Sequence, residues 1–96
     1  MMKDKLLQII NHYGINKQLK YIHSEYFELD EIIISYEESG NSLSDYYEEH
    51  ITEEIADVMV MLKQFQYYYG IEDKQVEDVM NYKIDRQLDR IGKENK

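Results

Sequence analysis

Two pairs of acidic residues have a spacing that would let them work together. Glu25 and Glu28 are three residues apart, and so are Glu54 and Asp57. In an α-helix, residues three apart lie on neighbouring faces, so each pair would present two carboxylates on one side. If two such helices pack antiparallel, the four carboxylates can converge. Oxygen ligands without His or Cys nearby suit Mg²⁺ or Mn²⁺ better than Zn²⁺. The spacing therefore indicates a candidate metal site.

The acidic residues are distributed unevenly along the chain. Of 96 residues, 20 are acidic and 11 are basic, which gives a net charge of -9. Residues 21–62 include twelve Asp and Glu and no Lys or Arg. Self-repulsion among so many carboxylates opposes a compact state. Two interpretations stay open: a solvated acidic face screened by salt, or carboxylates that hold a cation.

The composition argues against several classes of protein. The chain has no cysteine, so it has neither a disulfide framework nor a thiolate metal site. The acidic balance argues against nucleic-acid binding, which needs a basic face, and against binding to anionic membranes. No apolar run approaches the roughly 18–20 residues that span a bilayer, and the first residues lack a signal-peptide cleavage pattern. We therefore expect a cytoplasmic protein that binds neither nucleic acid nor membrane.

Hydrophobic periodicity predicts four helices, over residues 3–12, 16–38, 44–69 and 73–91, and no strand. Apolar residues recur at spacings of three and four in each of the last three helices. The second stripe is Leu19, Ile22, Tyr26, Leu29, Ile33 and Tyr36, the third is Ile51, Ile55, Val58, Leu62, Phe65 and Tyr69, and the fourth is Val76, Val79, Met80, Ile84, Leu88 and Ile91. The short connections favour antiparallel neighbours.

The predicted fold is therefore all-α: one domain over residues 1–96, arranged as an antiparallel bundle of about four helices. A chain of this length buries only about 60–65% of its unfolded surface, so its own core would be marginal. We expect oligomerisation to complete the bundle.

Three basic residues gather on the fourth predicted helix. Lys83, Arg86 and Arg90 fall within roughly 60° of one another on a helical wheel. Such a strip could bind a polyanion opposite the acidic pairs. It could instead stabilise the carboxyl end of the helix, or pair with Asp85 and Asp89.

Two stretches resemble the motifs of a known family. Residues 18–29, QLKYIHSEYFEL, look like the first motif of the MazG-like nucleotide pyrophosphohydrolases, and residues 53–62, EEIADVMVML, look like the second. Together they give the family's ExxE…ExxD signature as Glu25, Glu28, Glu54 and Asp57. Residues 81–91, NYKIDRQLDRI, are similar to the basic closing helix of the family. The resemblance covers about residues 14–91.

The chain also departs from parts of the family pattern. Many members carry a second Glu at the position of Ser24. Phosphoribosyl-ATP pyrophosphatases usually carry a His shortly after the Asp of the second motif, where this chain has Val58 to Met61. Dimeric dUTPases are generally longer chains. These differences argue against those two branches of the superfamily.

The resemblance implies an all-α enzyme that hydrolyses a nucleoside triphosphate, NTP or dNTP, to the monophosphate and pyrophosphate. The four acidic residues would be the catalytic groups and would hold Mg²⁺, with Mn²⁺ as an alternative, while Glu25 or Glu28 would act as the base. Gln18 would contact the nucleotide, and Lys83, Arg86 and Arg90 would bind its phosphates. Family members work as homodimers or homotetramers.

A non-enzymatic function stays open beside the hydrolase. An acidic helical bundle could mimic DNA or bind a basic partner. Such a binding or mimicry module would spread its acids outward. An enzyme would place four of them beside the apolar stripe, with basic residues facing them.

Overall fold

The structure is a computed structural model that describes residues 1–40 and 44–95. Four helices account for nearly all of these residues: α1 (Met2–Tyr13), α2 (Ile15–Glu38), α3 (Ser44–Tyr68) and α4 (Asp73–Glu94). The described residues contain no strand, so the all-α prediction is confirmed. Among these helices none combines the length and the apolar character needed to cross a bilayer.

Gly14 separates the first two helices. Its φ of 90° lies in the left-handed region that glycine adopts without a steric penalty, and its amide donates to the carbonyl of Ile10 over 2.8 Å. The helix α2 then begins at once at Ile15, one residue before the predicted start at Asn16. The sharp break lets α1 turn across α2 and α3, where Leu6 and Ile10 are buried.

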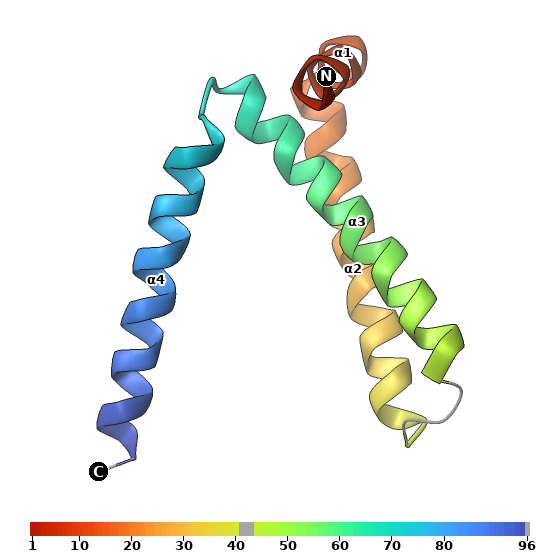
Figure 1. The fold of residues 1–96 in the computed structure, drawn as a ribbon. Helices are drawn as coiled ribbons and strands as arrows, with labels where there is room; N and C mark the ends of the chain where they lie inside the picture. The colour runs from red at the N-terminus through yellow and green to blue at the C-terminus, as the bar shows by residue number, and fades with distance from the viewer. Residues whose placement is uncertain (41–43, 96) are drawn as a thin grey trace.

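Helices α2 and α3 form an antiparallel pair, and α1 lies across one end of it (Figure 1). The residues of α2 that are most shielded from solvent recur at spacings of three and four along one face: Gln18, Ile22, Glu25, Leu29, Ile32 and Tyr36. The matching face of α3 contains Tyr47, Ile51, Glu54, Val58, Met61 and Phe65. We call the contact between these two faces the α2–α3 seam.

The seam differs from the predicted apolar stripes. On α2 the prediction placed Leu19, Tyr26 and Ile33 in the packed face, and all three are exposed. In the third predicted stripe the same holds for Ile55 and Leu62 of α3, and for Tyr69, which directly follows α3. The physical reason is that each helix is rotated about its own axis. Polar residues on the side of α1 enter the seam, and half of each stripe turns to solvent on the opposite side.

Helix α4 stands apart from the other three (Figure 1). None of its residues is buried. The predicted bundle of four helices is therefore not formed within the described part of one chain: α1, α2 and α3 pack together, and the apolar stripe of α4 from Val76 to Ile91 has no partner there. The helix also continues through Gly92 to Glu94, beyond its predicted end at Ile91.

The turn between α3 and α4 is held by a network of hydrogen bonds around Asp73. Its carboxylate accepts from Lys63 Nζ at 2.7 Å, from Gln66 Nε2 at 2.8 Å and from the Tyr67 hydroxyl at 2.8 Å. Gln66 Nε2 also donates to the carbonyl of Ile71 at 3.0 Å. These bonds tie the last turns of α3 to the first residue of α4, so the direction in which α4 leaves the pair is fixed.

Candidate functional site

Three carboxylates converge at the α2–α3 seam. Glu25 of α2 and Glu54 and Asp57 of α3 each offer an oxygen, and these oxygens all lie within 4.8 Å of one another. We call them the carboxylate cluster. The heptad-like spacing of the seam positions Glu25 and Glu54 at facing sites, and Asp57 follows one helical turn after Glu54. Three of the four predicted ligands are thus brought together.

Two of these side chains each have one carboxylate oxygen withdrawn from solvent without a hydrogen-bond partner among the described residues. Glu25 is only 6% exposed, and Glu54 is partly buried. The Oε2 atoms of both are buried and accept no hydrogen bond from the described residues. Burying an unpaired carboxylate costs several kcal/mol even after relaxation, so groups of this kind are normally hydrogen-bonded, paired or bound to a metal.

The electrostatics of the cluster follow from this burial. Burial raises the pKa of Glu25, and the negative charges of Glu28 and Asp57 raise it further, while hydrogen bonding with Tyr21 acts in the opposite direction. Burial also raises the pKa of Glu54, with Glu28, Asp57 and Glu25 adding to the effect. Both carboxylic groups therefore hold a proton more readily than usual, and a cation would relieve the same repulsion.

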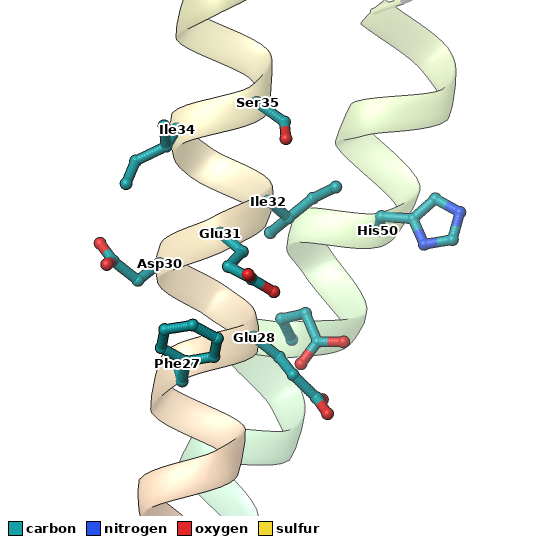
Figure 2. A pocket seen from close by; sticks show the side chains of 9 residues that line it. Phe27, Glu28, Asp30, Glu31, Ile32, Ile34, Ser35 and His50 are labelled. Carbon is teal, nitrogen blue, oxygen red and sulfur yellow. The ribbon is translucent and has the colours of Figure 1, made fainter.

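Glu28, the fourth predicted ligand, lies beside the cluster. It lines an open groove with a volume of about 670 Å³, to which Glu54 also contributes. Figure 2 shows Glu28, Glu31 and Ile32 projecting from α2 on the side of α3, with His50 reaching outward from α3. Glu28 is exposed, so its carboxylate is accessible from the groove.

A second pocket, of about 440 Å³, lies between α1, α2 and α3 on the other side of the cluster. Glu25 and Asp57 line it together with Gln18, the predicted nucleotide contact. Gln18 is buried, and its Nε2 donates to Oε1 of Gln64 at 2.8 Å. The predicted contact residue is therefore next to the carboxylates, and its amide nitrogen is already engaged in the core.

The basic strip lies elsewhere. Lys83, Arg86 and Arg90 are exposed on α4, which meets α3 through hydrogen bonds to Asp73 and does not pack along the helices that carry the cluster. Within residues 1–40 and 44–95 none of the three forms an ion pair, so the expected alternative of pairing with Asp85 and Asp89 is not found. The structure does not bring these residues to the carboxylates of the same chain.

Sequence reasoning missed two residues beside the cluster. Tyr21 hydrogen-bonds with Glu25, which raises the pKa of the phenol. Gln64 is 1% exposed and forms the amide pair with Gln18. The sequence did contain a signal for Gln64, because this residue is seven positions after Asp57 and therefore lies on the same side of α3.

No protein-family model matches the chain, and neither do the curated proteins or the solved structures with which it was compared. Function must therefore be inferred from the residues of the site and from the resemblance of the two acidic motifs.

Proposed function

We propose that the protein is a Mg²⁺-dependent nucleoside triphosphate pyrophosphohydrolase, which hydrolyses an NTP or dNTP to the monophosphate and pyrophosphate. One observation carries the proposal. Glu25, Glu54 and Asp57 converge from two helices, and each of the first two has a buried oxygen that finds no hydrogen-bond partner within residues 1–40 and 44–95. The resemblance of the two motifs to those of the MazG-like enzymes is the second support.

The residues fit a hard divalent cation. All three groups of the cluster are carboxylates, and carboxylate oxygens are the protein ligands that Mg²⁺ and Mn²⁺ prefer. The unpartnered oxygens of Glu25 and Glu54 are free to ligate. When bound, Mg²⁺ would neutralise phosphate charge and polarise the phosphorus that is attacked.

Glu28 is the best placed of the acids to act as the general base. It lies outside the cluster of three, lines the same groove as Glu54 and is exposed to solvent. In the proposed reaction, a water oxygen attacks the α-phosphorus, and the bond to the leaving pyrophosphate breaks. Glu28 accepts the proton that the water loses.

The substrate would lie along the seam between the two pockets. Gln18 lies in the pocket on the α1 side, where its amide oxygen could contact the nucleotide. Lys83, Arg86 and Arg90 could bind the phosphates only from another subunit, since α4 does not reach the cluster of its own chain. The proposal therefore includes a homodimer or homotetramer.

The size of the core also supports an oligomer. The buried apolar residues among those described are Leu6, Ile10, Met61 and Tyr67. So few side chains give little hydrophobic stabilisation, and small domains of this kind commonly need association to be stable.

The test is product analysis with each NTP, each dNTP and dUTP in the presence of Mg²⁺. We expect monophosphate and pyrophosphate in equal amounts, no product with EDTA and at least a 100-fold loss of rate for Glu54→Gln. Glu53→Gln is a matched control, because Glu53 is adjacent, carries the same charge and is exposed. Diphosphate and phosphate as products would contradict the proposal. No product from any nucleotide, together with no stabilisation by Mg²⁺, would favour the acidic interaction protein instead.

A further inference from the structure

The described residues leave two apolar surfaces exposed to solvent. The first is formed by half of each predicted stripe on α2 and α3: Leu19, Tyr26, Ile33, Ile55, Leu62 and Tyr69. We call it the back face. The second is the apolar face of α4, formed by Met80, Ile84, Leu88 and Ile91, each between 50% and 60% exposed. Contiguous apolar surfaces that are exposed to solvent mark sites of association.

The back face lies opposite α1. The pocket beside α1 is lined by Tyr21 of α2 and Gln64 of α3. The three members of the back face on α2 are about 120–160° around that helix from Tyr21, and those on α3 are about 140–180° around theirs from Gln64. Both stripes therefore lie on the same side of the antiparallel pair and form one continuous surface.

The α4 of the same chain is held away from this surface. Asp73 accepts hydrogen bonds from Lys63, Gln66 and Tyr67, and the capping box of Glu72 and Gln75 fixes the first turn of α4. Folding α4 back onto its own α2 and α3 would break this network. The network therefore makes α4 an arm with a set direction, and the surface that covers its apolar face must come from another molecule.

The charges on α4 indicate what that molecule is. Lys83, Arg86 and Arg90 lie along one edge of the apolar face, and Asp78, Asp85 and Asp89 lie along the other edge. The surface that receives α4 should thus be apolar, with acidic groups beside the basic edge. The α2–α3 pair of this same chain has that character, with an exposed apolar stripe and no Lys or Arg in residues 21–62.

The apolar face of α4 is short enough to lie within the back face. It spans residues 80–91, which is about 16 Å at about 1.5 Å per residue, whereas the back face spans residues 19–33 and 55–69, which is about 21 Å.

We propose that two copies of this chain exchange their fourth helices, so that α4 of each packs along the back face of the other. The arrangement is reciprocal, as twofold symmetry requires. It refines the proposed homo-oligomer. It places the basic strip of one subunit beside the back face of the other, opposite the pocket that Glu25 and Asp57 line, so the strip could reach the phosphates only across a further subunit contact, as in a homotetramer. It does not depend on enzymatic activity, since a binding protein could associate in the same way.

The first test uses paired substitutions and sedimentation. Leu88→Glu on α4 and Ile33→Glu on α2 place a charge on the two proposed surfaces. Tyr82→Glu and Ile34→Glu are matched controls, because Tyr82 and Ile34 are 65% and 47% exposed but lie outside these surfaces. We expect a wild-type dimer, at least a tenfold weaker dimer for the first two variants and no change for the controls. A monomeric wild type would overturn both the oligomer and the exchange, and a dimer that withstands Leu88→Glu would overturn the exchange alone.

The second test separates exchange from folding back. Because the chain has no cysteine, single Leu62→Cys and Ile84→Cys variants can be mixed and joined with a bismaleimide. Exchange predicts a cross-linked species of twice 11.7 kDa that contains one of each variant. A second variant carries both Leu62→Cys and Ile84→Cys in one chain. If this double variant cross-links within one chain, and the mixture of single variants gives no heterodimer, the proposed exchange of helices is wrong. Helical circular dichroism checks that every variant is folded.

Discussion

Glu25 and Glu54 bring their carboxylates together across the α2–α3 seam, and the Oε2 atom of each is buried without a hydrogen-bond partner among the residues that the structure describes. Both occupy positions that an ordinary helical pair would fill with apolar residues. The contact therefore lowers stability when both groups are charged. A bound proton or a bound cation removes the penalty, and this choice governs the behaviour of the protein in solution.

Magnesium should stabilise the folded state. A ligand that binds only the folded protein raises stability by mass action. At 10 mM Mg²⁺ and a Kd of about 1 mM, the gain is about 1.4 kcal/mol, or roughly 6–11 °C in Tm for a domain of this size. The measurement is thermal unfolding by circular dichroism. The shift should be lost in Glu54→Gln and kept in Glu53→Gln, and an equal shift in both variants would remove Glu54 from the metal site.

Without metal, the protein should become more stable as the pH falls from neutral toward 4.5. The folded-state pKa values of Glu25 and Glu54 are raised above the ordinary 4.5, so the folded state binds more protons than the unfolded state in this window. Stability therefore decreases as the pH rises through it. As the pH is lowered from neutral to 4.5, Tm should rise less steeply for Glu54→Gln than for Glu53→Gln. The two substitutions make the same change in net charge. Identical slopes would contradict a penalty at Glu54.

The sequence predicted the helices well because their signals are local. The predicted boundaries lie within three residues of those observed, and the largest difference is at the end of the fourth helix, which continues through Gly92 to Glu94. The spacing of Glu25, Glu54 and Asp57 also predicted their convergence. Local pattern was sufficient there, since each pair is fixed by its own helix.

The sequence could not predict how the helices turn toward one another. Leu19 and Gln18 are adjacent, and apolar character alone favours Leu19 for the seam, yet Gln18 is buried and Leu19 is exposed. The choice depends on the contact with α1 and on the pairing of Gln18 with Gln64, which are 46 residues apart. The departure of α4 likewise depends on side chains that meet only after folding, above all Lys63 and Asp73.

The buried amide pair should contribute to stability as a unit. Gln18 Nε2 donates to Gln64 Oε1 at 2.8 Å, and both side chains are buried. Replacing one by Leu leaves the other without its partner, which costs about 1–3 kcal/mol. The double variant should lose less than the sum of the two single losses, because neither amide is then stranded.

Urea unfolding at a fixed protein concentration measures this coupling. The wild type, Gln18→Leu, Gln64→Leu and the double variant form a complete cycle. Gln8→Leu is the control, because Gln8 is exposed on α1 and should change stability by less than about 0.5 kcal/mol. Additive losses in the cycle would mean that the two amides act independently.

Asp73 should set the position of α4. The hydrogen bonds from Lys63, Gln66 and Tyr67 hold the pKa of Asp73 at about 2, below its ordinary 3.8. Its stabilising contribution is therefore present above pH 3.8 and is lost as the pH falls toward 2. Asp73→Asn should lower Tm at neutral pH and speed amide exchange in the first turns of α4.

The matched control for this substitution is Asp78→Asn. Asp78 has the same side-chain exposure of 62%, but its one ion pair in the described part of the chain is with Lys74, inside α4. Hydrogen exchange read by mass spectrometry separates the two cases. If amide hydrogens exchange faster in Asp73→Asn but not in Asp78→Asn, and Asp73→Asn also dimerises more weakly, then the turn positions α4 for a second copy of the chain. If Asp73→Asn leaves both the amide hydrogen exchange and the dimerisation unchanged, the turn is fixed by Gly70 and the capping box of α4, and the network around Asp73 is dispensable.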